Sequence, residues 1–329
     1  MEKKIVFSGI QPTGEIHLGN YFGSLKQWLD LQDKYFCFFS IVNLHALTEP
    51  ISPSSLEENT LKTTSYLLSL GLNPKKVVLF VQSDIPYHTE LTWLLSVVTP
   101  VGDLLRMTQF KDKAKQFKET VNAGLLNYPI LMASDILLYK AEYIPVGKDQ
   151  LQHLELTREI ARRFNRRFGQ TFPLPKAVLE ERGAKIMSLA EPKKKMSKSL
   201  GEEHYLGIFE EPEKIREKIA KAVTDSGKEI KYDQEKKPGI ANLLRIYSLV
   251  EGKEIKEIEK EFQGKGYAEF KKILAEKIID YFSQSREKFL AMKDKKEEIR
   301  EILKEGRRKA EEIAQKNIEE IRQKVGLKY

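Results

Sequence analysis

Two short segments, far apart in the chain of 329 residues, carry side chains that suit the binding of a polyanion. The segment SGIQPTGEIHLGN (8–20) places His17 and Asn20 one helical turn apart at a predicted helix start, where backbone N–H groups and the helix dipole favour phosphate. The segment PKKKMSKSLG (192–201) gathers four lysines and two serines around Met196. A polar helix cap and a solvated lysine run are the ordinary alternatives, and each segment taken alone leaves its alternative open.

A third candidate is an acidic residue inside an apolar run. Asp135 lies in AGLLNYPILMASDILLY (123–139), with leucine, isoleucine and methionine on both sides. Burying an unpaired carboxylate costs much free energy, so Asp135 needs a partner if it is inside the protein. The partner could be a ligand that donates a hydrogen bond. The alternatives are a position on the helix surface or an ion pair with Lys140.

The elements that must position these side chains alternate in the first half of the chain. Short apolar runs at 4–9, 35–42 and 77–83 are typical of buried strands, and the patterns at 19–34 and 56–70 are helical. Strands separated by helices predict a parallel, doubly wound, Rossmann-like α/β sheet. Ligands of such sheets bind at the carboxyl ends of the strands.

The pattern changes to charged helices with apolar stripes after about residue 202. We therefore expect an α/β catalytic domain at 1–202 and an all-α domain at 203–329. The last predicted helix, about 294–325, repeats apolar residues at steps of three and four, and could pack back on the first domain. Gly306 interrupts it, at a cost of about 1 kcal/mol relative to alanine.

The net charge of +8 is unevenly distributed. Residues 1–150 carry 14 basic and 15 acidic side chains, whereas residues 151–205 carry 12 and 7. Such asymmetry suits a nucleic acid partner. The arginine-rich segment LTREIARRFNRRFG (156–169) could contact a nucleic acid backbone, although a solvated helix face is equally ordinary.

Several classes of protein lose support from what the sequence lacks. Neither GxxxxGK[ST] nor a GxGxxG after a strand occurs, so kinase-type phosphate loops and dinucleotide binding are disfavoured. The single cysteine, Cys37, excludes an internal disulfide and favours a reducing compartment. The start MEKKIVFSG has only a very short apolar stretch, which predicts no signal peptide, and the longest apolar run, near 35–42, is too short to cross a bilayer. We expect a cytoplasmic protein.

The two polyanion-binding segments resemble the signatures of one enzyme family. His17-Leu18-Gly19-Asn20 is similar to the "HIGH" signature of class I aminoacyl-tRNA synthetases, and Lys195-Met196-Ser197-Lys198-Ser199 matches their "KMSKS" loop. Further segments resemble the tryptophan-activating branch of the class: 8–14, 107–111, 123–139, 144–153, 222–225 and 238–249.

This resemblance implies an enzyme that activates L-tryptophan with ATP and then transfers it to tRNA(Trp). It also implies a homodimer, an all-α domain that reads the anticodon, and Mg²⁺ that accompanies ATP without a metal site held by the protein. The indole of tryptophan has one polar atom, a donor N–H, and the resemblance gives Asp135 the task of accepting it.

The resemblance also assigns the other site residues. It assigns catalytic roles to Lys195, Lys198, Lys113, His17 and Asn20. ATP would be contacted by Gln11, Pro12, Thr13, Gly19, Asn20, Gly147, Lys148, Asp149, Ile186, Lys195, Met196, Ser197, Lys198 and Ser199. Tryptophan would be contacted by Asp135, Met132, Phe7, Tyr128, Gln150, Gln11, Ile144, Val146 and His45. The role of His45 is the least defined, since it could equally be structural.

The sequence departs from the family pattern at a few positions, and rival functions remain. Asn20 replaces the last histidine of the signature, Asn43 stands where many relatives have aspartate, and Lys148 stands where an acidic residue is common. The nearest rival is a tyrosine-activating enzyme, which shares both signatures. Two more distant rivals are a nucleotidylyltransferase for small molecules and a catalytically silent RNA-binding relative.

Overall fold

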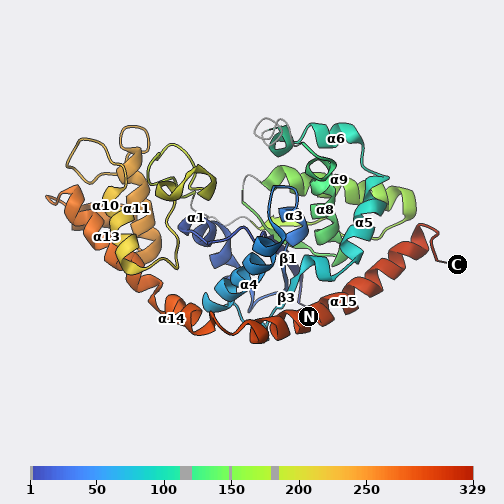
Figure 1. Cartoon of the computed structure of the whole chain (residues 1–329). Coiled ribbons are helices and arrows are strands. Elements are labelled where there is room, and N and C mark those ends of the chain that lie inside the picture. The colour runs from blue at the N-terminus through green and yellow to red at the C-terminus, as the bar shows by residue number, and fades with distance from the viewer. Residues whose placement is uncertain (1–2, 112–120, 148–149, 179–184, 329) are drawn as a thin grey trace. The chain divides into compact units, whose positions relative to one another are not determined.

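A computed structural model of the chain describes residues 3–111, 121–147, 150–178 and 185–328 (Figure 1). The chain divides into two compact units. Unit 1 consists of Met1–Gly14, Trp28–Glu180 and Asp294–Tyr329, and unit 2 consists of Glu15–Gln27 and Glu181–Lys293. Each unit is therefore assembled from segments that are distant in sequence. The predicted boundary between an α/β domain and an all-α domain at residue 202 stays a prediction.

Unit 1 is built on a parallel sheet of five strands in the order β3-β2-β1-β4-β5. Its strands are β1 (Ile5–Ile10), β2 (Phe36–Ile41), β3 (Val78–Val81), β4 (Tyr143–Pro145) and β5 (Lys176–Val178). The predicted doubly wound sheet is confirmed. The sequence pattern missed β4 and β5, because three residues are too few to establish a periodicity.

Helices cover the sheet, which explains why its central strands are apolar on both faces. The longer helices are α4 (Pro53–Ser69), α5 (Tyr87–Ser96), α8 (Ala123–Leu138), α9 (Leu151–Phe168) and α15 (Lys296–Lys324). The shorter ones are α2 (Lys26–Leu31), α3 (Asn43–Ala46), η2 (Gln82–Asp84) and α6 (Val101–Leu105). Contacts join α4 to β2, α8 to β1, α9 to β5 and α15 to β3.

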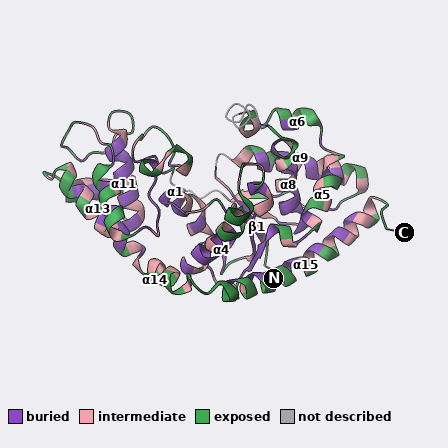
Figure 2. Cartoon of the chain, viewed as in Figure 1, coloured by how far each residue is buried: buried purple, intermediate pink, exposed green. Residues whose placement is uncertain are grey.

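The C-terminal helix α15 packs along β3 of unit 1. One face of it is buried, including Leu303, Ala314 and Ile318, and its other faces are exposed (Figure 2). A Cβ atom on Gly306 would overlap the carbonyl oxygen of Leu79. The glycine that weakens the helix is therefore the residue that allows helix and strand to approach closely.

Unit 2 is helical and contains the lysine segment 192–201 together with residues 15–20 of the first predicted phosphate-binding segment, whose residues 8–14 belong to unit 1. It begins with α1 (Leu18–Asn20) and the π-helical turn η1 (Tyr21–Leu25), and continues with η4 (Lys198–Leu200), η5 (Glu202–His204), α10 (Pro212–Lys221), α11 (Pro238–Glu251), α12 (Ile255–Glu261), α13 (Tyr267–Tyr281) and α14 (Ser283–Met292). Backbone bonds from Leu18 N to Leu206 O (3.0 Å) and from Ile208 N to Ile16 O (3.0 Å) join its two segments.

The strand order reverses between β1 and β4, so ligands are expected at the carboxyl ends of the strands near this point. Gln11 follows β1, Asn43 begins α3 shortly after β2, Gln82 follows β3, and Val146 follows β4. In the part of the chain that the structure describes, no helix is long and apolar enough to cross a membrane.

Candidate functional site

Asp135 is a buried carboxylate near the end of α8, with only 2% of its surface exposed. The start of this helix is fixed by Asn122, whose Oδ1 accepts a hydrogen bond from the Leu125 amide at 2.9 Å. The structure excludes both a position on the helix surface and a pair with Lys140. The residue is buried, and Lys140 instead donates to Glu320 at 2.6 Å.

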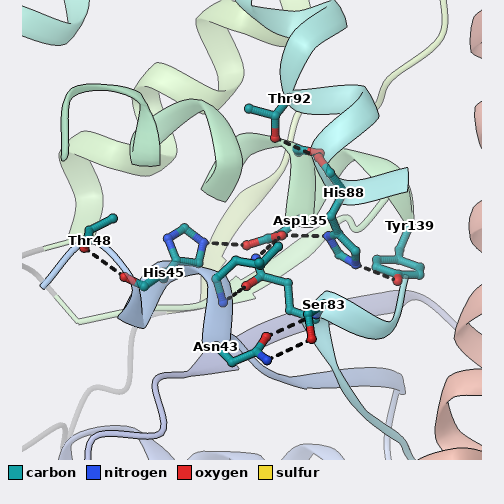
Figure 3. A network of polar contacts seen from close by, with 11 residues as sticks. Asn43, His45, Thr48, Ser83, His88, Thr92, Asp135 and Tyr139 are labelled. Atoms are coloured by element: carbon teal, nitrogen blue, oxygen red, sulfur yellow. Dashed lines mark hydrogen bonds and ion pairs between the residues drawn. The ribbon is translucent and has the colours of Figure 1, made fainter. Parts of the chain in front are cut away.

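Three side chains from three other elements surround the Asp135 carboxylate (Figure 3). Gln82 of η2 donates its Nε2–H to Oδ1 at 2.7 Å, and Nδ1 of His88, on α5, lies 2.7 Å from the same oxygen. Nε2 of His45, on α3, lies 2.8 Å from Oδ2. Because an ionised carboxylate only accepts hydrogen bonds, each of these nitrogens carries a proton.

Further contacts fix how these donors are oriented. The Leu44 amide donates to Oε1 of Gln82 at 3.1 Å, which leaves the Gln82 NH₂ group facing Asp135. The Tyr139 hydroxyl lies 3.0 Å from Nε2 of His88. Since Nδ1 of a neutral His88 donates to Asp135, its Nε2 accepts the proton of Tyr139. The network therefore points all its donors toward the carboxylate.

The pKa of Asp135 reflects two opposing effects. Burial raises it, but the hydrogen bonds and charge interactions with His45 and His88 outweigh burial and lower the pKa to about 2. Burial and the Asp135 charge raise the pKa of Tyr139 well above its usual range. At neutral pH the site therefore holds a carboxylate that accepts and a hydroxyl that donates.

Sequence reasoning missed Gln82, His88 and Tyr139. A weak signal was present, because Gln82 lies near the end of the apolar run 77–83, and strand ends are where ligand-binding residues of parallel sheets occur. His88 and Tyr139 carried no comparable signal. His88 matters because it contacts Asp135, which lies 47 positions away in the sequence. Tyr139 matters because it contacts His88.

The predicted walls of the tryptophan site belong to the apolar core beside this network. The Phe7 ring stacks on Tyr139 with centroids 5.7 Å apart and an interplanar angle of 9°. Ile144 is buried in the same cluster, and Met132 and Val146 pack against it. That these four side chains enclose an indole stays a prediction.

Tyr128, on α8, contacts both His45 of the network and His153 of α9. Its hydroxyl donates to Oε1 of Gln109 at 3.2 Å and lies 2.8 Å from Nε2 of His153. Its ring centroid is 6.3 Å from that of His45. Burial raises the pKa of Tyr128 to about 12, so its hydroxyl is protonated at neutral pH.

Other predicted residues of unit 1 lie in the turns that follow β1 and β4. Gln11, Pro12 and Thr13 follow β1, and the Thr13 amide donates to the Gln11 carbonyl at 2.9 Å. After β4 the Gln150 amide donates to the Gly147 carbonyl, also at 2.9 Å. The predicted residues Lys113, Lys148 and Asp149 lie outside the described residues.

In unit 2 His17 and Asn20 form a reciprocal cap on α1. The Asn20 amide donates to Nδ1 of His17 at 3.2 Å, and Oδ1 of Asn20 accepts from the His17 amide at 3.2 Å. Because Nδ1 of His17 accepts, the proton of the neutral ring is on Nε2. This N–H is the group that could donate to a phosphate oxygen.

The lysine segment 192–201 lies against this cap. Nζ of Lys198 donates to the Glu15 carbonyl at 2.8 Å. A Cβ atom on Gly19 would lie 3.0 Å from the His17 ring and 3.5 Å from Cβ of Met196. The structure therefore brings residues 15–20 and the lysine segment together within unit 2, although more than 170 residues separate them in sequence.

The remaining predicted residues of this segment differ in exposure. Met196 and Ile186 are buried, and the Met196 amide donates to the Ile186 carbonyl at 3.0 Å. Lys195 and Ser199 are exposed, and the Ser199 hydroxyl lies 2.9 Å from that of Ser197. Buried Met196 thus anchors a segment in which Lys195 and Ser199 are exposed and Ser197 and Lys198 are half-buried.

Burial and two neighbouring lysines keep the His17 ring neutral. Burial lowers its pKa most, and the charges of Lys198 and Lys195 lower it further, to about 3. A cationic neighbourhood around a neutral imidazole donor is suited to phosphate, which accepts hydrogen bonds and carries negative charge.

The arginine-rich helix α9 is largely paired with acidic side chains. Arg162 contacts Glu155 and Glu159, and Arg163 lies 2.6 Å from Asp103. This favours the ordinary interpretation of a solvated, ion-paired helix face over a nucleic acid contact.

Comparison with known proteins places the chain among related sequences. A family model described as "tRNA synthetases class I (W and Y)" matches residues 1–283. The chain is 51% identical over 325 residues to a tryptophan–tRNA ligase of Caldanaerobacter subterraneus, covering 98% of each protein. It is 47% identical over 328 residues to a tryptophan–tRNA ligase of Helicobacter pylori, covering 99% of this chain and 100% of the relative.

Solved structures give the same result. A tryptophanyl-tRNA synthetase of Mycoplasma pneumoniae matches with a TM-score of 0.90 and 33% identity, covering 100% of this chain and 99% of that one. The Campylobacter jejuni enzyme, solved with ADP and tryptophan, matches with a TM-score of 0.85 and 39% identity, covering 98% and 100%.

Proposed function

The chain belongs to the class I tRNA synthetases for tryptophan and tyrosine, and from this premise we propose how its residues perform the work of a tryptophan–tRNA ligase. The enzyme activates L-tryptophan with ATP to tryptophanyl-adenylate and pyrophosphate, and then transfers tryptophan to tRNA(Trp), releasing AMP. The observation that carries this function is the similarity to tryptophan–tRNA ligases over almost the whole of both chains.

Unit 1 recognises tryptophan through Asp135. A carboxylate has about four acceptor positions, and the described residues occupy three of them, two on Oδ1 and one on Oδ2. The indole N–H is proposed to donate to the remaining position on Oδ2. The ring would contact Phe7, Met132, Ile144 and Val146, with His45 beside it. Tyr128 and Gln150 would bind the α-amino group and Gln11 the carboxylate.

ATP is proposed to bind through both signature segments. Nε2–H of His17 and the side-chain NH₂ of Asn20 would donate to phosphate oxygens, while Gln11, Pro12, Thr13 and Gly19 approach through the backbone. The remaining ATP contacts are proposed for Gly147, Lys148, Asp149, Ile186, Met196, Ser197 and Ser199.

In the activation step a carboxylate oxygen of tryptophan attacks the α-phosphorus of ATP. The bond between that phosphorus and the bridging oxygen breaks, and the electron pair leaves with pyrophosphate. Lys195 and Lys198, with Lys113 as a third cation, are proposed to stabilise the charge that develops on this leaving group. Such cations contribute most where charge builds up in the transition state.

Mg²⁺ is proposed to arrive bound to the ATP phosphates rather than to a site on the protein. Across residues 3–111, 121–147, 150–178 and 185–328, no group of three His, Cys, Asp or Glu side chains could hold a metal ion. Phosphate oxygens are ligands that Mg²⁺ prefers, and the ion commonly reaches such sites with its substrate.

The helical part of the chain after residue 202 is proposed to read the anticodon, while residues 1–202 carry the catalytic domain. Single-stranded bases are commonly read by stacking and polar contacts, which a helical surface can supply. The cytoplasm is the proposed compartment, which agrees with the single cysteine, buried Cys37.

A homodimer is also proposed, formed through α5 and α6 of unit 1. Trp93 (71% exposed), Val97, Val101 and Leu105 are large apolar side chains at the surface, in two pairs spaced four residues apart. Trp93→Glu is expected to shift the protein from dimer to monomer in sedimentation equilibrium. If the wild-type protein sediments as a monomer, the proposed dimer is refuted, and the proposed activation chemistry is unaffected.

The decisive experiment is ATP–pyrophosphate exchange with each of the twenty amino acids. We expect exchange that depends on tryptophan, and tRNA(Trp) should then accept the activated amino acid. Stimulation by tyrosine instead would favour the tyrosine-activating rival. Exchange that does not depend on any amino acid would favour a nucleotidylyltransferase. The absence of exchange with all twenty amino acids would favour a catalytically silent RNA-binding protein.

A further inference from the structure

We propose that His88 is a positioning residue for tryptophan selection, whose imidazole holds the Asp135 carboxylate with Oδ2 toward the indole N–H. His88 is completely buried, so it can act on a ligand only through Asp135. This inference rests on the proposed assignment of Asp135 to the indole, and the experiment below separates the two.

The first step is that the two carboxylate oxygens accept different numbers of hydrogen bonds. Oδ1 accepts from Gln82 and His88, each at 2.7 Å, whereas His45 alone contacts Oδ2 among the described residues. Two donors on one side determine which oxygen keeps an unused acceptor position. Without His88 each oxygen would have a single donor, and the carboxylate could rotate about its Cβ–Cγ bond between two similar orientations.

The second step is that a contact on the side away from the carboxylate supports the tautomer of His88 that donates to Asp135. The carboxylate requires a proton on Nδ1, and the Tyr139 hydroxyl lies 3.0 Å from Nε2, where it can donate to the neutral ring. Tyr139 itself is clamped by aromatic stacking, with ring centroids 5.7 Å from Phe7 and 4.4 Å from Phe38. The predicted pocket wall Phe7 therefore supports the same chain of hydrogen bonds that orients the acceptor.

The third step concerns the backbone of His88, which is held independently of its ring. Oγ1 of Thr92 donates to the His88 carbonyl at 2.7 Å (Figure 3). Oγ of Ser134 donates to the same carbonyl, also at 2.7 Å. These bonds stabilise the same turn of α5 but do not touch Asp135. Thr92→Val is therefore a matched control, because it weakens the turn and leaves the imidazole contacts in place.

The fourth step is the effect of pH. The titratable groups that face Asp135 are His45 from α3, His88 from α5 and Tyr139 from the end of its own helix. Burial favours the protonated carboxyl, which loses part of its acceptor capacity, and the hydrogen bonds from the two histidines oppose this. Removing the His88 donor should therefore make tryptophan binding weaken at a higher pH than in the wild type.

The experiment compares tryptophan with its benzothiophene analogue, in which sulfur replaces the N–H, by ATP–pyrophosphate exchange. The wild type should prefer tryptophan by roughly 100-fold or more in kcat/KM. His88→Phe should reduce this ratio by roughly tenfold, mainly through the KM for tryptophan, because a hydrogen bond to a charged group is lost. His88→Asn, whose amide can donate from near the Nδ1 position, should recover most of the ratio, and Thr92→Val should keep it.

The pH dependence provides a second readout. In His88→Phe the KM for tryptophan should rise between pH 7 and pH 5 more steeply than in the wild type. If His88→Phe does not fold, Tyr139→Phe and His88→Asn test the same network. Tyr139→Phe removes the hydrogen-bond partner of Nε2 of His88 and should lower the ratio a few-fold, whereas His88→Asn should not.

The outcomes separate the two claims. A wild type that accepts both amino acids equally would remove Asp135 from indole recognition, and this inference with it. A selective wild type whose selectivity survives in His88→Phe, or in Tyr139→Phe where only that variant folds, would overturn the role of His88 alone. Equal losses in His88→Phe and Thr92→Val would also overturn it, since they would point to general loosening of α5.

Discussion

The Asp135 network and the lysine segment 192–201 bind charge in opposite ways. Asp135 is 2% exposed and is contacted by donors from α3, η2 and α5. Lys195 and its neighbours lie at the surface, anchored by buried Met196, and Lys198 donates to a backbone carbonyl. One region fixes a single acceptor by packing, and the other presents several cations to solvent.

The difference follows from what each region is proposed to bind. A single neutral N–H offers only one hydrogen bond for recognition. That bond discriminates tryptophan from its analogues only if the acceptor is desolvated, charged and held in one orientation. A triphosphate carries several negative charges, and mobile cations can close on it during the reaction. The Asp135 network should therefore be sensitive to packing, and the lysine segment to charge.

The largest expected effect is on catalysis by the lysine segment. Lys198→Ala should lower kcat for activation by roughly 10²–10³-fold, as the loss of other groups that stabilise transition-state charge does. The KM for ATP should change much less. Lys194→Ala is the control, because Lys194 pairs with Glu191 at 2.7 Å, and its exchange rate should stay near that of the wild type. A loss confined to KM would mean that Lys198 serves binding alone.

The next effect concerns the packing on which unit 1 depends. Gly306→Ala would force a Cβ atom into the Leu79 carbonyl on β3, the strand that leads to Gln82. The free energy of unfolding should fall by about 3 kcal/mol, measured by denaturant titration. Gly23→Ala in η1 is the control, since open space surrounds its Cβ position, and it should be neutral or slightly stabilising. An unchanged midpoint for Gly306→Ala would show that α15 does not press on β3.

A smaller effect is expected on stability in acid. The pKa of Asp135 in the folded protein, about 2, is below that of a free aspartate. Its stabilising contribution is therefore complete above the unfolded pKa of ~3.9 and is lost as pH falls toward 2, by about 2 kcal/mol in total. The difference in unfolding free energy between wild type and Asp135→Asn should shrink over this interval. A constant difference from pH 5 to pH 2.5 would contradict an ionised Asp135.

The last prediction is that the His17 ring does not titrate near neutral pH. Its pKa of about 3 means that the ring stays neutral from pH 8 to pH 5, so an NMR titration should show no protonation of His17 near pH 6.5. Because its folded pKa is below the unfolded one, His17 makes the protein less stable as pH falls from about 6.5 toward 3. Lys198→Ala should raise the pKa of His17 only partly, since burial is the larger cause. A wild-type midpoint near 6.5 would indicate that His17 is solvated.

The sequence predicted the parts of the fold that depend on local pattern. The apolar runs at 4–9, 35–42 and 77–83 correspond to β1, β2 and β3, because a strand buried on both faces needs consecutive apolar residues. β4 and β5 escaped prediction, since a strand of three residues is defined by its neighbours in the sheet rather than by its own pattern.

The candidate site divides in the same way. The sequence pointed to His17, Asn20 and the lysine segment 192–201 because the two segments together resemble the signatures of one family, although each taken alone left an ordinary alternative open. It also singled out Asp135, a carboxylate in an apolar run. It did not identify Gln82 and His88, because a buried glutamine and a buried histidine are recognisable only when their partner is known.

By itself the sequence determined which chemistry is available: donors and cations for phosphate in two segments, and one acceptor for a donor ligand. Only the tertiary structure decided that Asp135 meets His45, Gln82 and His88, and that Lys198 lies beside the cap formed by His17 and Asn20. The physical reason is that a residue's type is fixed by the chain, whereas its charge, tautomer and orientation depend on neighbours that folding brings from distant positions.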